Sequence, residues 1–276
     1  MPLTLRWRAS TTLPVDGSPL KPETFRERTL ADAARVVLRV GNATAEVSDL
    51  FDVEGDAADE SLIVEGDLNH IHKLGRGMTR GALTARGDLG FQAGAEMVGG
   101  SFLLEGSCGD WAGAEMRGGM LRILGEAGDF LGAAYPGSRH GMREGVILVE
   151  GSAGNDVGLM MRRGLIAVGG SVGAGRGRGL IAGTIVARAG AGPAAGVGMK
   201  RGTLVLAAGD EDAERSISPT FAFTGRMRLP FLTIYAKQLA EWGFAVPEMM
   251  SPGLFDRYNG DLASGGQGEI LVAARP

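Results

Sequence analysis

Apolar and polar residues alternate in short segments that recur about every nineteen residues through the middle of the chain. In every copy the second and fourth residues of the segment are apolar. The second residues are Leu62, Leu83, Phe102, Leu121, Ile147, Ile166, Ile185 and Leu204, and the fourth residues are Val64, Ala85, Leu104, Ile123, Val149, Val168, Ala187 and Leu206. This period of two predicts a series of short strands, each with one buried face.

A longer motif surrounds these strands, because GAEMVGG at 94–100 returns as GAEMRGG at 113–119. Thirteen-residue copies of the form GxxMxxGx(I/L)x(V/I)xG lie at 75–87, 94–106, 113–125, 139–151, 158–170, 177–189 and 196–208, with a seven-residue insertion around YPGSRHG. Interior glycine costs a helix about 1 kcal/mol relative to alanine, which excludes helical units. Strands that enter in one direction at a fixed interval form parallel ladders. We therefore predict an all-β fold, a parallel β-helix solenoid of about seven nineteen-residue coils.

Methionine occupies one position of this motif throughout. The set is Met78, Met97, Met116, Met142, Met161 and Met199, with Leu180 standing in once. Because methionine commonly fills irregular gaps in a core, the column predicts an internal stack rather than a soft-metal site.

The two flanks of the repeat lack the motif. We predict an N-terminal cap at 1–59, the glycine-rich repeat at 60–209, and a C-terminal tail or cap at 210–276. Within the tail, FLTIYAKQLAEWG at 231–243 has helical spacing and ends at glycine, which predicts a helix.

Composition narrows the class of protein. The 276 residues hold 47 glycines and one cysteine, Cys108, so no internal disulfide can form, which fits a reducing cytoplasm. A net charge of -4 gives no general attraction to nucleic acid or to an anionic membrane. The start, MPLTLRWRAS, lacks the apolar core of a signal peptide, and no apolar run approaches the roughly 18 residues that cross a bilayer.

Few residues have the spacing of a catalytic site. His70 and His72 form an HxH pair in a loop, and His140 lies in the insertion; two ligands underspecify a metal site, so we interpret them as polar surface. GAGRGRG at 173–179 falls in the repeat with no helix after it, which argues against a phosphate loop. No nucleophile elbow or zinc-protease motif is present, and the sequence predicts no catalytic residue and no metal site.

The third strand position is too apolar for a surface left in water. It reads Ile63, Thr84, Leu103, Arg122, Leu148, Ala167, Val186 and Val205. Either the chain's own tail or another subunit covers this column, and Ile63, Leu103, Leu148, Val186 and Val205 are the candidates for a partner interface. The fifth position, with Glu65, Arg86 and Glu105, predicts a ladder of opposite charges.

A cationic column follows the methionines. It comprises Arg117, Arg143, Arg162 and Lys200, and like charges stacked at about 4.8 Å repel unless they are neutralised. Two interpretations stay open, a solvated edge or a contact for an anionic partner or polyanionic tail.

Several segments together carry a resemblance to a known family. GDLNHIHKLGRGMTRG at 66–81, FDVEGD at 51–56, RYNGDLASGGQGEIL at 257–271 and the repeated glycine–methionine corners resemble the C subunit of formylmethanofuran dehydrogenase and of its bacterial relative, the formyltransferase/hydrolase complex. The repeat alone also resembles the C-terminal domain of glutamate synthase. That domain lacks this start and tail.

The resemblance implies a right-handed, single-stranded β-helix without an active site of its own, in a cytoplasmic hetero-oligomer. In the bacterial complex, formyl passes from formyl-tetrahydromethanopterin to a methanofuran-type carrier (methylofuran) and is hydrolysed to formate during formaldehyde oxidation. Amidohydrolase-like and formyltransferase subunits would hold the catalytic groups. The carrier resembles a glutamate-bearing polyanion, which Arg117, Arg143, Arg162 and Lys200 would steer, while this chain alone binds no cofactor.

The alternatives are the C subunit of an archaeal-type formylmethanofuran dehydrogenase, a glutamate-synthase-like domain linking catalytic domains, and a carbohydrate-processing β-helix enzyme. Lysine occurs only at 21, 73, 200 and 237, which leaves 28 − 4 = 24 arginines. This bias, with abundant alanine and glycine, indicates a GC-rich genome and favours the bacterial, methylotrophic version.

Overall fold

The computed structural model describes the chain except for residues 57, 208–210, 246–249, 251–252 and 275–276. Its strands are β1 (Leu3–Trp7), β2 (Val15–Asp16), β3 (Val37–Val40), β4 (Ala43–Glu46), β5 (Phe51–Glu54), β6 (Ser61–Glu65), β7 (Ile71–His72), β8 (Ala82–Arg86), β9 (Ser101–Leu104), β10 (Arg117–Ile123), β11 (Glu144–Val149), β12 (Leu165–Val172), β13 (Thr184–Ala191), β14 (Thr203–Leu206), β15 (Ala222–Arg228), β16 (Leu254–Gly260) and β17 (Gly268–Ala273). The helical segments are α1 (Pro22–Phe25), α2 (Leu30–Ala34), α3 (Val47–Leu50), α4 (Glu211–Arg215), α5 (Phe231–Glu241) and the short 3₁₀ helix η2 (Leu262–Ser264).

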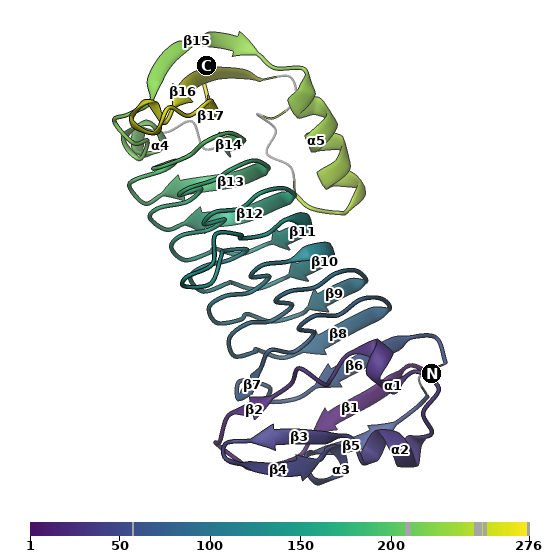
Figure 1. Ribbon diagram of the computed structural model, residues 1–276. Helices are drawn as coiled ribbons and strands as arrows, with labels where there is room; N and C mark the ends of the chain where they lie inside the picture. The colour runs from purple at the N-terminus through teal and green to yellow at the C-terminus, as the bar shows by residue number, and fades with distance from the viewer. Residues whose placement is uncertain (57, 208–210, 246–249, 251–252, 275–276) are drawn as a thin grey trace.

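One large sheet organises the molecule, and Figure 1 shows its strands stacked along a single direction. It has 13 strands in the order β15-β16-β17-β14-β13-β12-β11-β10-β9-β8-β6-β1-β5. The pairs from β1 through β14 to β17 are parallel, whereas β1–β5, β16–β17 and β15–β16 are antiparallel. A second sheet has four strands in the order β4-β3-β2-β7.

The predicted fold class, an all-β right-handed single-stranded β-helix of about seven coils, is wrong. The described strands form one large, mostly parallel sheet with antiparallel strands at both ends, accompanied by a few helices. The physical reason lies in the return segments between successive strands. These segments pair through single bridges, such as Leu89 with Cys108 and Cys108 with Ala127, rather than through ladders of their own. The division of the chain at 59/60 and 209/210 stays a prediction, and Ala208, the last residue of the seventh repeat, lies outside the described residues.

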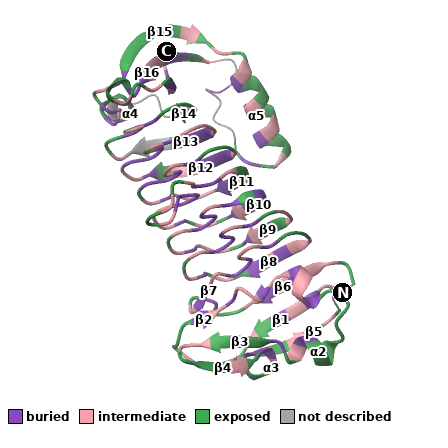
Figure 2. Cartoon of the chain, in the orientation of Figure 1, coloured by how far each residue is buried: buried purple, intermediate pink, exposed green. Residues whose placement is uncertain are grey.

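The strand columns predicted from the alternating pattern are confirmed. Leu83 pairs with Phe102 and Phe102 with Leu121 in parallel register, and the second and fourth residues of every predicted strand are at most 3% exposed. The methionine stack is confirmed as well, since all six methionines and Leu180 are fully buried. Figure 2 shows this buried interior running along the stack of strands.

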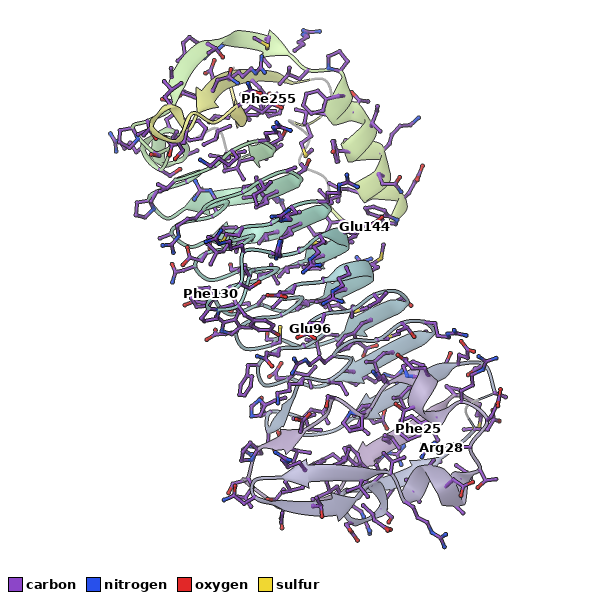
Figure 3. All side chains as sticks on the ribbon, viewed as in Figure 1. Phe25, Arg28, Glu96, Phe130, Glu144 and Phe255 are labelled. Atoms are coloured by element: carbon purple, nitrogen blue, oxygen red, sulfur yellow. The ribbon has the colours of Figure 1, made fainter. Side chains whose placement is uncertain are left out.

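The ends of the stack are closed by segments outside the motif. Phe25, the last residue of α1, and Phe255 in β16 lie at opposite ends of the molecule in Figure 3. They are 0% and 1% exposed. The predicted tail helix is also confirmed as α5, although it ends at Glu241, two residues before the glycine. Apolar side chains of both flanks are therefore buried at the two ends of the stack, whereas the outermost strand β15 is exposed or half-buried along its whole length.

Arg176 is the one charged residue that is fully buried among the described residues. It occupies the register position that is apolar elsewhere, as in Leu74, Leu131 and Val157, each one residue before a unit's first glycine. Its guanidinium donates to the carbonyl of Gly192 at 2.8 Å and to Ser216 Oγ, and burial lowers its pKa to about 10. The side chain thereby ties the core to a segment 40 residues further along the chain.

At several strands the glycine that starts the strand contacts the methionine of the preceding unit. At Gly164, φ is +100°, and a Cβ atom built there would lie 2.7 Å from Met142 Cε and 2.8 Å from the Gly145 carbonyl oxygen. The same contact recurs between Gly183 and Met161, at 2.8 Å. An L-residue side chain is excluded both by the backbone conformation and by the space available.

We predict that Gly164→Ala destabilises the chain by about 2 kcal/mol or more, because it combines a strained φ with a clash in the core. Thermal unfolding followed by circular dichroism measures the loss. Gly137→Ala is the matched control, since φ is +85° there and nothing lies within 4 Å of a Cβ. Equal losses in the two variants would mean that φ strain, and not the methionine contact, sets the cost.

Candidate functional site

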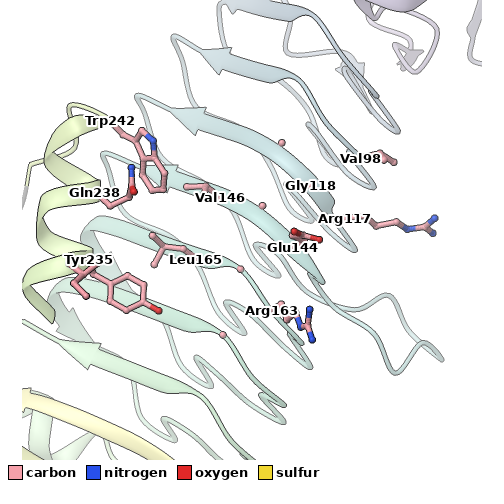
Figure 4. A pocket seen from close by; sticks show the side chains of 15 residues that line it. Val98, Arg117, Gly118, Glu144, Val146, Arg163, Leu165, Tyr235, Gln238 and Trp242 are labelled. Carbon is pink, nitrogen blue, oxygen red and sulfur yellow. The ribbon is translucent and has the colours of Figure 1, made fainter. Parts of the chain in front are cut away.

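A groove runs between α5 and the N-terminal ends of the neighbouring strands of the large sheet. Its volume is about 940 Å³. Figure 4 shows Tyr235 and Gln238 of α5 on one side, with Trp242 directly after the helix, and Val146 and Leu165 on the strands that they face. Glu144 and Arg163 lie at the starts of neighbouring strands, and the groove extends past Arg117 to Val98.

Glycine forms the floor of this groove. Gly118, Gly119, Gly145, Gly164 and Gly183 come from successive units and line it. Neighbouring backbone explains their lack of side chains, because a Cβ on Gly118 would lie 2.3 Å from the Val98 carbonyl oxygen. The packing that fixes the sheet edge therefore also leaves an open ledge beside α5.

The predicted cationic column borders this groove: Arg117 lines it, and Arg143 and Arg162 each immediately precede a lining residue. Arg117 and Arg162 are exposed, and Arg143 is half-buried. The backbone N–H of each donates to the carbonyl of the methionine one unit earlier, at 2.7 Å: Arg117 to Met97, Arg143 to Met116 and Arg162 to Met142. The three residues therefore stand in the same register of consecutive units. Arg163 joins them on the rim, and within the described part of the chain no acidic group forms an ion pair with any of these four arginines.

Lys200 lies further along the same register and is separated from Arg162 by Ile181. Its Nζ donates to the Ser264 carbonyl at 2.9 Å, so it also fastens η2 to the stack. The structure brings Arg117, Arg143 and Arg162 together and leaves Lys200 apart from them. Arg163 strengthens the cluster, and the aromatic wall from α5 is a part of the groove that the strand pattern gives no sign of.

The apolar column of third strand positions divides into two halves. Leu148, Val186 and Val205 are at most 1% exposed. They pack in one cluster with Leu232, Ala236 and Leu239 of α5 and with Phe244 and Phe255. Ile63 and Leu103, in contrast, are only half-buried and lie outside that cluster. Of the two coverings that the sequence left open, the tail is the one present over the later half.

Arg122 stands at the boundary between the two halves. Its guanidinium donates to the carbonyls of Trp242 at 2.5 Å and Gly243 at 2.9 Å, just after α5, and to Glu150 at 2.7 Å. These carbonyls are unsatisfied at a helix end, where a cation is also favoured by the helix dipole. Arg122 therefore holds the end of α5 against the sheet.

The side chains that could act as a base or a nucleophile, His72 and Cys108, are buried or hydrogen-bonded within the chain. Nδ1 of His72 accepts from the Phe91 N–H at 3.1 Å, and its ring stacks on Phe91 at 3.9 Å. Burial lowers the pKa of His72, and the positive charge of Lys73 adds to this effect. Burial also raises the pKa of Cys108 to about 12, so its thiol stays protonated and is a poor nucleophile. Among the described residues no three His, Cys, Asp or Glu side chains gather as metal ligands would.

The glycine-rich stretch at 173–179 has its two arginines occupied within the chain. Arg176 is buried as described above, and Nε of Arg178 donates to Asp156 at 2.9 Å. With its cations paired internally, this stretch offers no free charge to a phosphate group.

Across the described residues, no helix has both the length and the apolar character that would let it cross a membrane. The fold and the groove define a sheet-rich protein built from stacked units, with a cationic rim beside a covered apolar face.

Comparison with known proteins extends this class to a family. No family model matches the chain. The C subunit of the tungsten-containing formylmethanofuran dehydrogenase 2 of Methanothermobacter thermautotrophicus is 31% identical over 87 residues, which are 30% of this chain and 32% of that protein. The corresponding subunit of Methanococcus maripaludis is 30% identical over 89 residues, covering 32% of this chain and 33% of that protein. These matches therefore span about a third of the curated relatives' length.

A solved structure extends the similarity to the whole chain. One chain of the crystal structure of the formyltransferase/hydrolase complex (FhcABCD) from Methylorubrum extorquens, solved in complex with methylofuran, is 33% identical with a TM-score of 0.90. The match covers 99% of this chain and 100% of that chain. The chain belongs to the family of formylmethanofuran dehydrogenase C subunits.

We predict that Arg122→Met loosens α5 while the stack of strands stays intact. The change removes charged hydrogen bonds to two carbonyls, each worth about 1.5–3 kcal/mol, so amide hydrogen exchange across 231–243 should accelerate at least tenfold. Mass spectrometry of the exchanging peptides measures it. Arg117→Met, on the same strand but without a described side-chain partner, should leave that exchange unchanged. An unaltered rate in Arg122→Met would show that apolar packing and the hydrogen bond between Thr184 and Tyr235 hold α5 without Arg122.

Proposed function

We propose that the chain is a non-catalytic structural subunit of a formyltransferase/hydrolase complex. In this complex formyl-tetrahydromethanopterin gives its formyl group to a methanofuran-type carrier, and the formylated carrier is hydrolysed to formate during formaldehyde oxidation. The observation that carries the proposal is the match over the whole chain, at 33% identity, to one chain of the Methylorubrum complex.

The chemistry of the described residues supports a structural role. Hydrolysis of a formamide needs an activated water or nucleophile, usually placed by a metal or by a base. The buried Cys108 is protonated, and His72 uses Nδ1 to accept a backbone hydrogen bond. We therefore assign the bond-making steps to two partners, one amidohydrolase-like and the other a formyltransferase.

An archaeal-type complex is the second candidate. The curated relatives are subunits of tungsten- and molybdenum-containing formylmethanofuran dehydrogenases. The shorter extent of those matches favours the first proposal over this one.

The cationic rim lets this protein take a direct part in handling the carrier. We propose that Arg117, Arg143, Arg162 and Lys200 attract the carrier's anionic tail as it moves between partner sites. The support is electrostatic: the three arginines stand in consecutive units without described acidic partners, so bringing an anion to them relieves their mutual repulsion.

We predict that the chain, tagged and purified gently from its own host, is held in a complex with two further kinds of subunit. Native mass spectrometry gives the composition, and release of formate from formyl-tetrahydromethanopterin is assayed on the same sample. The complex should be active and the chain expressed alone should be inactive, because the catalytic groups belong to the partners. A lone chain that turns over substrate would overturn the structural role.

We also predict that Arg143→Ser, Arg162→Ser and Lys200→Ser together weaken carrier binding to the complex at least tenfold at low salt, since each lost cation removes a screened attraction. Carrier retention after gel filtration measures the effect. The control variant carries Arg28→Ser, Arg35→Ser and Arg39→Ser, which removes the same charge from exposed positions in the N-terminal segment. If both variants retain the carrier equally, the rim does not bind it, and its charges are only solvated.

A further inference from the structure

One largely apolar column crosses the outer face of the large sheet from β1 to β17. Its members are consecutive Cα partners in the ladder: Thr4, Ile63, Thr84, Leu103, Arg122, Leu148, Ala167, Val186, Val205 and Leu271. From Leu148 to Leu271 every member is at most 1% exposed. From Thr4 to Leu103 every member is half-buried, so the chain covers only part of a continuous surface.

The covered part shows what kind of element this surface accepts. α5 lies along the later strands and does not reach β8 or β9 (Figure 1). It buries Leu232, Ala236 and Leu239, which are spaced i, i+4 and i+7 and so form one face of a helix. The later half of this column therefore already binds one amphipathic helix, which lies along the stack of strands.

The uncovered part has a cavity of its own, separate from the groove beside α5. This cavity has a volume of about 390 Å³, adjoins Arg122, and is lined by Leu103, Met120 and Leu124 among others. Leu124 is 42% exposed, which is high for a leucine beside another apolar group. The cavity opens directly where α5 ends, so a second helix could follow α5 along the same line.

The flanks of the uncovered part are electrically balanced. Arg6 and Glu65 lie 2.9 Å apart, Glu65 and Arg86 3.2 Å, and Arg86 and Glu105 3.4 Å. The hydrogen bond from Arg6 is the main cause that lowers the pKa of Glu65, so this carboxylate stays ionised. A charge ladder that neutralises itself neither attracts nor repels a charged occupant, so apolar contact decides what binds.

The dimensions fit a short helix. The rows from Thr4 to Leu103 are three strand spacings of about 4.8 Å, or about 14 Å in all. A helix rises about 1.5 Å per residue, so about ten residues cover this length. α5 itself has 11 residues.

A second copy of this chain does not supply such a helix from its described residues. α1, α2, α3 and α4 have four or five residues each, and the apolar face of α5 is already packed against its own sheet. The solved relative is one chain of a multi-subunit complex, which favours a helix of a partner subunit as the occupant.

We propose that an amphipathic helix of a partner subunit docks on Thr4, Ile63, Thr84 and Leu103, end to end with α5. Its apolar residues at i, i+4 and i+7 contact this column, and the ladder of Arg6, Glu65 and Arg86 flanks it. The proposal rests on the proposed function in so far as the partner belongs to the same complex, and it names the face and the chemistry of that contact.

The test uses the complex purified from its own host with the chain tagged. Ile63→Glu and Leu103→Glu together should reduce retention of one partner subunit at least tenfold by native mass spectrometry, because two carboxylates would be buried in an apolar contact. Both positions are half-buried, so the variant chain should keep its unfolding midpoint. Val37→Glu places the same charge on an exposed valine of β3 and should retain every subunit.

A photo-crosslinking residue at position 84 identifies the occupant. The proposal expects the crosslink to map to a segment of a partner subunit with apolar residues at i, i+4 and i+7. Crosslinks to a second copy, to a segment without that pattern, or full retention of every partner by the double variant would overturn the docking helix. A wild-type chain that co-purifies with no subunit would instead overturn the proposed function, and the docking helix with it.

Discussion

Close approach of a glycine to the preceding unit at the start of each strand is the constraint on which the rest of the structure depends. Each unit enters its strand through a glycine with positive φ whose missing Cβ leaves room for the backbone of the preceding unit. At Gly100, Gly145, Gly164 and Gly183 the methyl of that unit's methionine also occupies this place, as Met142 does beneath Gly164. Because strands in a sheet lie about 4.8 Å apart, neither a side chain on the glycine nor a longer residue in the methionine column fits that spacing. The parallel register, the buried columns and the glycine floor of the groove all follow from this one packing rule.

The same rule sets what the outside of the molecule can do. Residues at the same position of successive units lie side by side in one row. A charge or an apolar side chain that recurs with the repeat therefore forms a continuous patch on the surface. At the position after the methionine, three consecutive rows carry arginines without described acidic partners, namely Arg117, Arg143 and Arg162. The fifth strand position instead alternates Arg6, Glu65, Arg86 and Glu105 into a ladder of ion pairs. One surface keeps its charge available for an anion and the other cancels it.

The interior could be predicted because its residues recur with the repeat. The exterior was harder to predict because its contacts join residues that lie far apart in the chain. The apolar strand positions and the methionine stack could be predicted because each depends on neighbours a fixed interval away. The fold class could not, since the antiparallel strands β5, β15 and β16 come from flanks without the motif and the return segments form only single bridges. The role of Arg122 was equally hidden, because its partners Trp242 and Gly243 lie 120 and 121 residues away. A single charge in an apolar column, as at Arg122, was the one signal that such a contact existed.

Arg122 and Arg176 interrupt the pattern in related ways, and this explains why the tail sits where it does. Each places a guanidinium in a largely apolar column. Arg122 donates to the carbonyl of Trp242, and Arg176 donates to the carbonyl of Gly192 and the hydroxyl of Ser216. A buried or half-buried cation is costly unless it is hydrogen-bonded, so both sites favour the one arrangement that supplies acceptors. Apolar packing alone would let α5 slide along a column of similar side chains from Leu271 to Thr4. The guanidinium of Arg122 fixes the end of that helix at β10, and the part of the column beyond it stays open.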